Sequence, residues 1–211
     1  MMGVNLFVRG MTVLVWLALA SLAPAQTGPL KSEDFCLGGK PGAPIRVEVF
    51  SDYQCPSCRG FYLETIRPLL KEYGQDNKVC VIYYEFPLKS HKFAFEASRY
   101  AVAAGRLGKD QRLRVMEALY ENQSRWAADG KIEALVEGIL SPEEMDKVRK
   151  FLKDPAIDQP IHQDIKLAAE RRVNSTPTFF IYANGREQKV VGKISYPVLK
   201  DYLNRMLKGM K

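Results

Sequence analysis

Residues 46–58, which read RVEVFSDYQCPSC, contain the pattern that decides the fold. The stretch from Arg46 to Phe50 alternates in polarity and is rich in valine, which predicts a β-strand. Cys55 and Cys58 follow within a few residues, and the stretch from Arg59 to Tyr73 has apolar side chains at helical spacing. The pattern predicts a strand that leads directly into a helix, with two cysteines where the helix begins.

The start of a helix favours a negative charge on the first cysteine. Its unpaired backbone N–H groups and its dipole stabilise an anion, so the pKa of the Cys55 thiol is expected within about 3.5–7.5. Pro56 suits the first helical position, where a backbone N–H has no partner within the helix. Cys58 lies one turn further on and can close a disulfide with Cys55. A redox pair is therefore predicted, in which Cys55 reacts with the substrate and Cys58 resolves the mixed disulfide.

The remaining segments predict an α/β chain with a helical block in its middle. The expected elements are, in order, a buried strand at 79–86, helices within 91–173, a strand at 178–182, a return strand at 188–191 and a last helix from 196. The helical crossover implies that the first two strands are parallel, and Asn184-Gly185 predicts a hairpin turn. Pro68 is expected to kink the first helix. The last helix is expected to bury a face that includes Val198 and Leu199.

Composition excludes several classes of protein. The chain has 211 residues, of which 46% are hydrophobic and 26% charged, values that argue against disorder and collagen-like repeats. Its 31 basic and 24 acidic residues give a formal net charge of +7. No run of basic residues is present, so nucleic-acid binding is not expected. The two histidines are too few for a His-rich metal site, and the length predicts a single domain.

Residues 1–25 are predicted to be a secretory signal peptide. Arg9 precedes an apolar run from Met11 to Ala23, and Ala23-Pro24-Ala25 resembles a cleavage site that ends at Ala25. A helix of that apolar run rises about 20 Å, which is less than the roughly 30 Å of bilayer hydrocarbon. We therefore expect a periplasmic or secreted protein, and an uncleaved membrane anchor is the alternative.

Three segments together resemble the DsbA-like thiol–disulfide oxidoreductases. They are EVFSDYQCPSCRGF at 48–61, FPL with His91 at 86–91, and VNSTPTFF at 173–180. The resemblance extends from about Ile45 to Leu207. It implies a thioredoxin-like fold in residues 44–211, with the order β-α-β, helical insertion at about 91–173, then β-β-α, around a mixed sheet. Residues 26–43 are expected to be an extended N-terminal segment.

The resemblance also implies a site and partners. Cys55 and Cys58 are the catalytic pair, Thr176 and a cis-Pro177 bind substrate, and the residues that support the motif are Pro56 and Ser57. No metal is expected, and no cofactor is needed beyond the redox-active Cys55–Cys58 disulfide. The expected partners are exported proteins with thiols or disulfides, and a membrane redox partner that recycles the cysteine pair. Residues 26–43 are too few for a dimerisation domain, so a monomer is expected.

Two positions depart from the family pattern and leave the direction of exchange open. Many members have a buried glutamate six residues before the first cysteine, where this chain has Val49. Neighbouring Glu48 should face the opposite side of the strand. Ser57 stands where the most oxidising members have histidine, and a neutral hydroxyl stabilises a thiolate less than an imidazolium. The favoured function is a DsbA-like oxidase. The alternatives are a periplasmic disulfide reductase, a metallochaperone that binds metal through the cysteine pair, and a protein whose Cys55–Cys58 disulfide is inert.

Two further cysteines, Cys36 and Cys80, are left outside the CPSC motif. Export to an oxidising compartment favours a structural disulfide between them. The alternatives are a buried Cys80 with a free Cys36, or a zinc site built from all four cysteines. Structural zinc sites usually use paired C-x-x-C knuckles, and this chain has one such pair.

Overall fold

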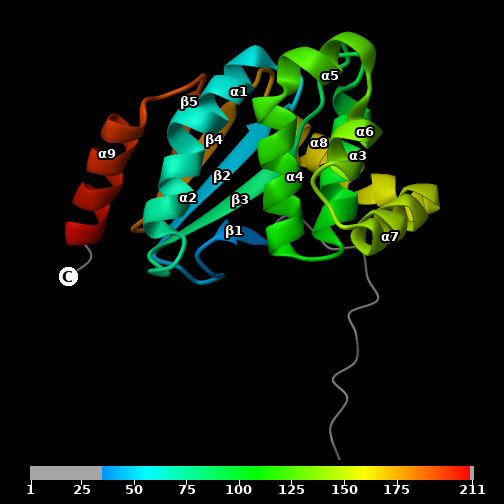
Figure 1. The fold of residues 1–211 in the computed structure, drawn as a ribbon. Helices are drawn as coiled ribbons and strands as arrows, with labels where there is room; N and C mark the ends of the chain where they lie inside the picture. Colours follow the sequence, from blue (N-terminus) through cyan, green and yellow to red (C-terminus); the bar gives the residue numbers. More distant parts are fainter. Residues whose placement is uncertain (1–34, 210–211) are drawn as a thin grey trace, which may run out of the picture.

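The computed structural model describes residues 35–209. They form a mixed five-stranded sheet in the order β1-β3-β2-β4-β5, with helices against both of its faces (Figure 1). The predicted signal peptide, residues 1–25, lies outside the described residues, and so does the 26–34 part of the predicted N-terminal segment. Within residues 35–209, no helix has both the length and the apolar character needed to cross a bilayer.

Three strands form the centre of the sheet. Strand β2 (Ile45–Ser51) pairs in parallel with β3 (Val79–Glu85), and on its other side it pairs antiparallel with β4 (Thr178–Ala183). Every residue of β3 is buried, because helices cover both faces of the sheet at this strand. The predicted parallel βαβ unit and the mixed sheet are confirmed.

One edge strand was not predicted. The short strand β1 (Cys36–Gly38) pairs antiparallel with the outer edge of β3. Three residues are too few to show an alternating pattern, so only the tertiary pairing reveals this strand. Cys36, the first residue of β1, forms a disulfide with Cys80 of β3. This bond ties the N-terminal segment to the sheet.

The helix after the cysteines is interrupted rather than simply bent. It consists of α1 (Pro56–Phe61), a π-helical turn (Tyr62–Ile66) and α2 (Arg67–Tyr73). The expected kink at Pro68 is thus found as a widened turn just before it. A proline ring clashes with the carbonyl group four residues earlier, and a π-helical turn at that place relieves the clash by moving the carbonyl away.

The predicted helical block lies between β3 and β4. Its elements are α3 (Ala94–Gly105), α4 (Lys109–Glu121), α5 (Gln123–Asp129), α6 (Ile132–Glu137), α7 (Pro142–Lys153), a 3₁₀ turn (Pro155–Asp158) and α8 (Gln159–Glu170). Figure 1 shows α4 and α5 beside the cysteine helix, whereas α6 and α7 extend away from the sheet. Trp126 is buried inside the block and donates to the Leu119 carbonyl at 2.7 Å.

The C-terminal elements follow the predicted order. Strand β5 (Arg186–Val191) returns antiparallel to β4 through Asn184 and Gly185, which both have positive φ, as a tight hairpin turn requires. Helix α9 (Tyr196–Lys208) buries Leu199 and Leu203. The prediction for Val198 is wrong: its side chain is 55% exposed, because it lies beside the face that packs on the π-helical turn and α2.

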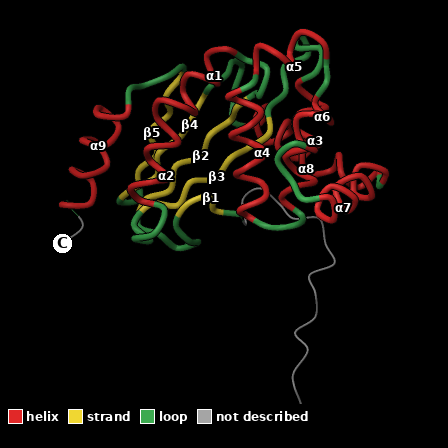
Figure 2. The backbone as a smooth tube through the Cα atoms, viewed as in Figure 1, coloured by secondary structure: helices red, strands yellow, loops and turns green. Residues whose placement is uncertain are grey.

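Different helices cover the two faces of the sheet (Figures 1 and 2). One face carries Val49 and packs against α1, α2, α4 and α9, and this cluster includes both CPSC cysteines. The opposite face carries Phe50 and Tyr84, which pack near α8. Since neighbouring strand residues alternate between faces, this separation decides which side chains can reach the cysteines.

The Cys36–Cys80 disulfide should stabilise the fold without taking part in exchange. The bond spans 44 residues, and loops of this size contribute about 2–4 kcal/mol by restricting the unfolded chain. Replacement of both residues (Cys36→Ser with Cys80→Ala) should lower the free energy of unfolding by that amount, as measured by guanidinium denaturation. The rate of reaction at the CPSC pair should stay unchanged. An unaltered unfolding midpoint would contradict the assignment.

Candidate redox site

Cys55 occupies the N-cap position of α1. Its backbone is extended, with φ −75° and ψ 121°, and its carbonyl accepts the first helical hydrogen bond from the Arg59 N–H at 3.1 Å. Cys58 lies one turn inside the helix and is fully buried, whereas Cys55 is 8% exposed. Both thiols are free in this structure. Cys55 is therefore the more accessible of the two thiols.

The two thiols have opposite pKa shifts. The neighbouring Cys58 side chain is the largest influence that lowers the pKa of Cys55, to about 5, and the nearby Thr176 side chain and the backbone N–H groups of Cys58 and Ser57 lower it further. Burial raises the pKa of Cys58 well above its ordinary value, and the hydrogen bond to Cys55 raises it further. The helix start therefore acts together with the second cysteine, rather than alone as the sequence suggested.

The loop before Cys55 is held by a buried carboxylate. Asp52 is fully buried and accepts hydrogen bonds from the backbone N–H groups of Gln54 at 2.6 Å and Leu88 at 2.7 Å. It also pairs with Nδ1 of His91 at 2.8 Å. These bonds fix the loop between β2 and α1 against the loop that follows β3.

A second anchor comes from the helical block. The side-chain amide of Gln123, at the start of α5, donates to the carbonyls of Tyr53 at 2.7 Å and Cys55 at 3.0 Å. Sequence reasoning missed both Asp52 and Gln123. Asp52 is close to the motif and could have been considered, whereas Gln123 is 68 residues away from Cys55 and no local pattern marks it.

The predicted substrate-binding residues lie against Cys55. The Thr176–Pro177 peptide bond is cis, and the Cys55 thiol points to the Thr176 carbonyl at 3.6 Å. The Pro177 carbonyl accepts from the Gly192 N–H at 2.8 Å. Of the motif-support residues, both Pro56 and Ser57 are exposed. The structure thus brings the cysteines, the proline loop and the exposed motif residues to one end of the sheet.

Glu48 lies on the other face of β2, as its alternation with Val49 predicts. Its side chain is nearly buried and pairs with Arg46 at 2.7 Å and with Arg171. The Arg171 guanidinium in turn lies 3.5 Å from the centre of the Phe180 ring. Glu48 therefore balances charge on the face away from the cysteines and does not reach either of them.

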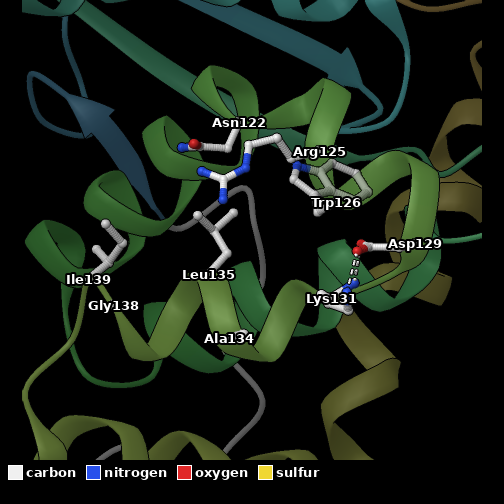
Figure 3. Close-up of a pocket in the computed structure, with 9 residues that line it drawn as sticks. All are labelled: Asn122, Arg125, Trp126, Asp129, Lys131, Ala134, Leu135, Gly138 and Ile139. Carbon is white, nitrogen blue, oxygen red and sulfur yellow. Dashed lines mark hydrogen bonds and ion pairs between the residues drawn. The ribbon is translucent and has the colours of Figure 1, made fainter.

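A groove of about 460 Å³ opens between α5 and α6, where Trp126 and Leu135 lie among its lining residues. In Figure 3 the side chain of Arg125 extends over Leu135, and Lys131 is paired with Asp129. Neither cysteine lines this groove. The groove is therefore separate from the end of the sheet where the two cysteines lie.

Comparison with known proteins agrees with this geometry. The sequence model of the thioredoxin family matches residues 31–204. A Bacillus cereus protein named as a probable disulfide bond formation protein D is 26% identical over 155 residues, which are 70% of this chain and 68% of that protein. The disulfide bond formation protein D of Bacillus subtilis is 26% identical over 182 residues, which are 81% of this chain and 76% of that protein.

A solved structure shares the fold. The thiol-disulfide exchange protein alpha-DsbA2 of Wolbachia pipientis has a TM-score of 0.67 with 23% identity, over 80% of this chain and 84% of that one. The chain belongs to the thioredoxin family, because the family model matches most of its length. Within that family it is one of the DsbA-like thiol–disulfide oxidoreductases.

Substitution of Cys58 should change the acidity of Cys55. Cys58→Ala removes the largest influence that lowers the pKa of Cys55, so the pKa should rise above 5, whereas Cys58→Ser retains a hydroxyl donor and should keep part of the effect. In both variants the thiolate fraction should fall as the pH drops through the pKa. The pH dependence of iodoacetamide alkylation measures this. Identical profiles for the two variants would show that the side-chain hydrogen bond has no part in the acidity.

Proposed function

We propose that this protein forms disulfide bonds in exported proteins. Substrates attack the sulfur atom of Cys55, and Cys58 is its partner in the protein's own disulfide. The observation that carries the proposal is the difference between the two thiols. Cys55 is acidic, at the N-cap and partly accessible, whereas Cys58 is fully buried with a raised pKa. An acidic first thiol and a buried second thiol suit an exchange reaction in which only one sulfur meets the substrate.

The proposed cycle begins with the Cys55–Cys58 disulfide. A substrate thiolate attacks Sγ of Cys55, the bond to Cys58 breaks, and the Cys58 sulfur leaves with the electron pair and takes up a proton. A second substrate thiolate then attacks the substrate sulfur of the mixed disulfide. The substrate is released with a new disulfide, and Cys55 leaves as a thiolate. The low pKa of Cys55 makes it a good leaving group in this last step.

Two features support the oxidising direction over the reductase alternative. A Cys55 pKa near 5 stabilises the reduced form at neutral pH, which makes the disulfide form a stronger oxidant. The two Bacillus relatives are named for disulfide bond formation. Ser57 supplies no positive charge beside Cys55, so we expect an oxidant that is weaker than the family members with histidine at that position.

The location and the partners are part of the proposal. Residues 1–25 have the pattern of a signal peptide, and the Cys36–Cys80 disulfide is of the kind that persists in oxidising compartments. We therefore propose that the protein lies in the periplasm or outside the cell. We also propose that it is a monomer and does not bind nucleic acid. Each cycle leaves two electrons on the cysteine pair, and a membrane redox partner would remove them.

Trapping of substrates tests the assigned roles. Cys58→Ala leaves a reactive Cys55 without its resolving partner, so mixed disulfides with exported proteins should accumulate on non-reducing gels. Cys55→Ala leaves only a buried thiol with a raised pKa, and it should trap little. The double variant is the control for background. Equal trapping by the two single variants would show that the roles are reversed or shared.

A further inference from the structure

The reaction places a negative charge on a buried sulfur. When a substrate thiolate attacks Cys55, the Cys58 sulfur leaves as a thiolate, and it does so in a fully buried position. A charge in such surroundings is costly unless hydrogen-bond donors face it. Val49, on the same face of β2 as the cysteines, is apolar and supplies no donor. The question is which groups stabilise this sulfur.

The polar groups around Cys58 come from several elements. Cys55 lies at the N-cap of α1 and raises the pKa of the Cys58 thiol. Thr176 lies in the loop before β4 and lowers it. Ser51 is the last residue of β2, two residues after Val49 on the same face, and its hydroxyl lowers the pKa of the Cys58 thiol. Tyr83 of β3 and Tyr120 of α4 carry further hydroxyls near Cys58. Negative charge on Cys58 raises the pKa of both tyrosines.

Two buried charged side chains on this side of the sheet are paired with each other. Glu85, next along β3 on the face of Tyr83, accepts from Arg112 at 3.0 Å and from the Tyr53 hydroxyl at 3.1 Å. The Glu85 and Arg112 side chains are both almost completely buried. Neither side chain is among the main groups that act on the pKa of Cys58, whereas the hydroxyl groups of Ser51 and Thr176 are.

Three buried hydroxyls form a continuous chain behind Cys58. The Ser51 hydroxyl hydrogen-bonds that of Tyr120 at 2.9 Å, and the Tyr120 hydroxyl hydrogen-bonds that of Tyr83. If Ser51 donates to the sulfur, it accepts from Tyr120, which in turn accepts from Tyr83. All three protons then point along the chain towards Cys58, an arrangement in which each hydrogen bond strengthens the next.

The middle of the chain is held in place by packing. The Tyr120 ring stacks on Tyr62, with 4.7 Å between ring centres, and lies 5.1 Å from the ring of Tyr53. The backbone carbonyl of Tyr120 accepts from Nε of Arg59 at 2.9 Å. Helix α4 is thereby fixed against the cysteine helix, and its tyrosine hydroxyl is directed at Ser51.

We propose that Ser51 donates a hydrogen bond to the Cys58 sulfur as that sulfur becomes negative, and that Tyr120 and Tyr83 hold the Ser51 hydroxyl in the donating orientation. Ser51 is a catalytic residue in this scheme because it touches a reacting atom, and the two tyrosines are positioning residues. The inference rests on the proposed function, and it names the groups that make the buried sulfur a usable leaving group.

The step balances without a further reactant. The substrate thiol loses its proton to solvent and attacks Sγ of Cys55 as a thiolate. The Cys55–Cys58 bond breaks, the new bond to Cys55 forms, and the electron pair moves to the Cys58 sulfur. The Ser51 proton stays on its oxygen and only donates, and the Cys58 thiolate then takes up one proton from solvent. The Cys55–Cys58 disulfide is itself the oxidant, and no other oxidant and no metal is consumed.

The test measures the reduction of the oxidised protein by glutathione, in which Cys58 is the leaving group. Ser51→Ala should slow this step by about three- to tenfold. The factor is smaller than for a full hydrogen bond to a charged group, because the Cys58 sulfur carries only part of its negative charge when the disulfide breaks. Tyr120→Phe and Tyr83→Phe should slow it in the same direction by a smaller factor, and Ser51→Thr should restore the rate because it keeps the hydroxyl.

The matched control is Tyr62→Phe. It removes a hydroxyl from the same aromatic cluster, but Tyr62 is not part of the chain and its ring packing is kept. Its rate should equal that of the wild type. A general loosening of the core would slow this variant too, and thermal melts of all variants show whether each one is folded.

A second readout reports on the sulfur itself. In a Cys55→Ala background, alkylation of Cys58 at one fixed alkaline pH should slow by about tenfold when Ser51 is replaced by Ala, because a rise of about one unit in the pKa lowers the thiolate fraction tenfold. The same rate should stay unchanged with Tyr62→Phe. Unchanged reduction and alkylation rates in the Ser51 and Tyr120 variants would overturn the proposal. The rate assay uses glutathione and no protein substrate. A failure to oxidise exported proteins would therefore contradict the proposed function, but it would not affect the result of this assay.

Discussion

The hydrogen bond from the Cys58 side chain to Cys55 is the interaction on which the site depends. It exists only if Cys55 ends the loop after β2 and Cys58 lies one helical turn later, both at the same end of the sheet. Asp52 fixes that loop from one side, and Gln123 fixes it from the other. The interaction favours charge on one sulfur and opposes it on the other, which gives two chemically similar cysteines opposite pKa shifts.

The helical block between β3 and β4 contributes directly to the redox site. Gln123 of α5 holds the Cys55 carbonyl, Tyr120 of α4 reaches Ser51, and Arg112 of α4 neutralises Glu85. These side chains convert a general thioredoxin sheet into a site with its own polar interior. The sheet supplies the frame, and the inserted helices supply much of what surrounds Cys58.

Local patterns predicted what local forces determine. The alternation in β2, the crossover to β3, the Asn184–Gly185 turn and the place of Glu48 all depend on residues close in sequence, and the structure agrees with them. Strand β1 was missed because it is stabilised only by pairing with β3. Gln123 and Tyr120 were missed because they reach the site through tertiary packing, and Val198 was misplaced because periodicity does not show how wide a buried face is.

If the acidity of Cys55 makes this cysteine pair an oxidant, the reduction potential of the pair lies above that of thioredoxin. The equilibrium of the Cys55–Cys58 pair with glutathione measures this potential. We expect a value between about −270 mV, as in thioredoxin, and about −120 mV, as in the strongest oxidants of this kind. A value at or below the thioredoxin figure would make the protein a reductant, and one below about −300 mV, typical of structural disulfides, would contradict a redox role altogether.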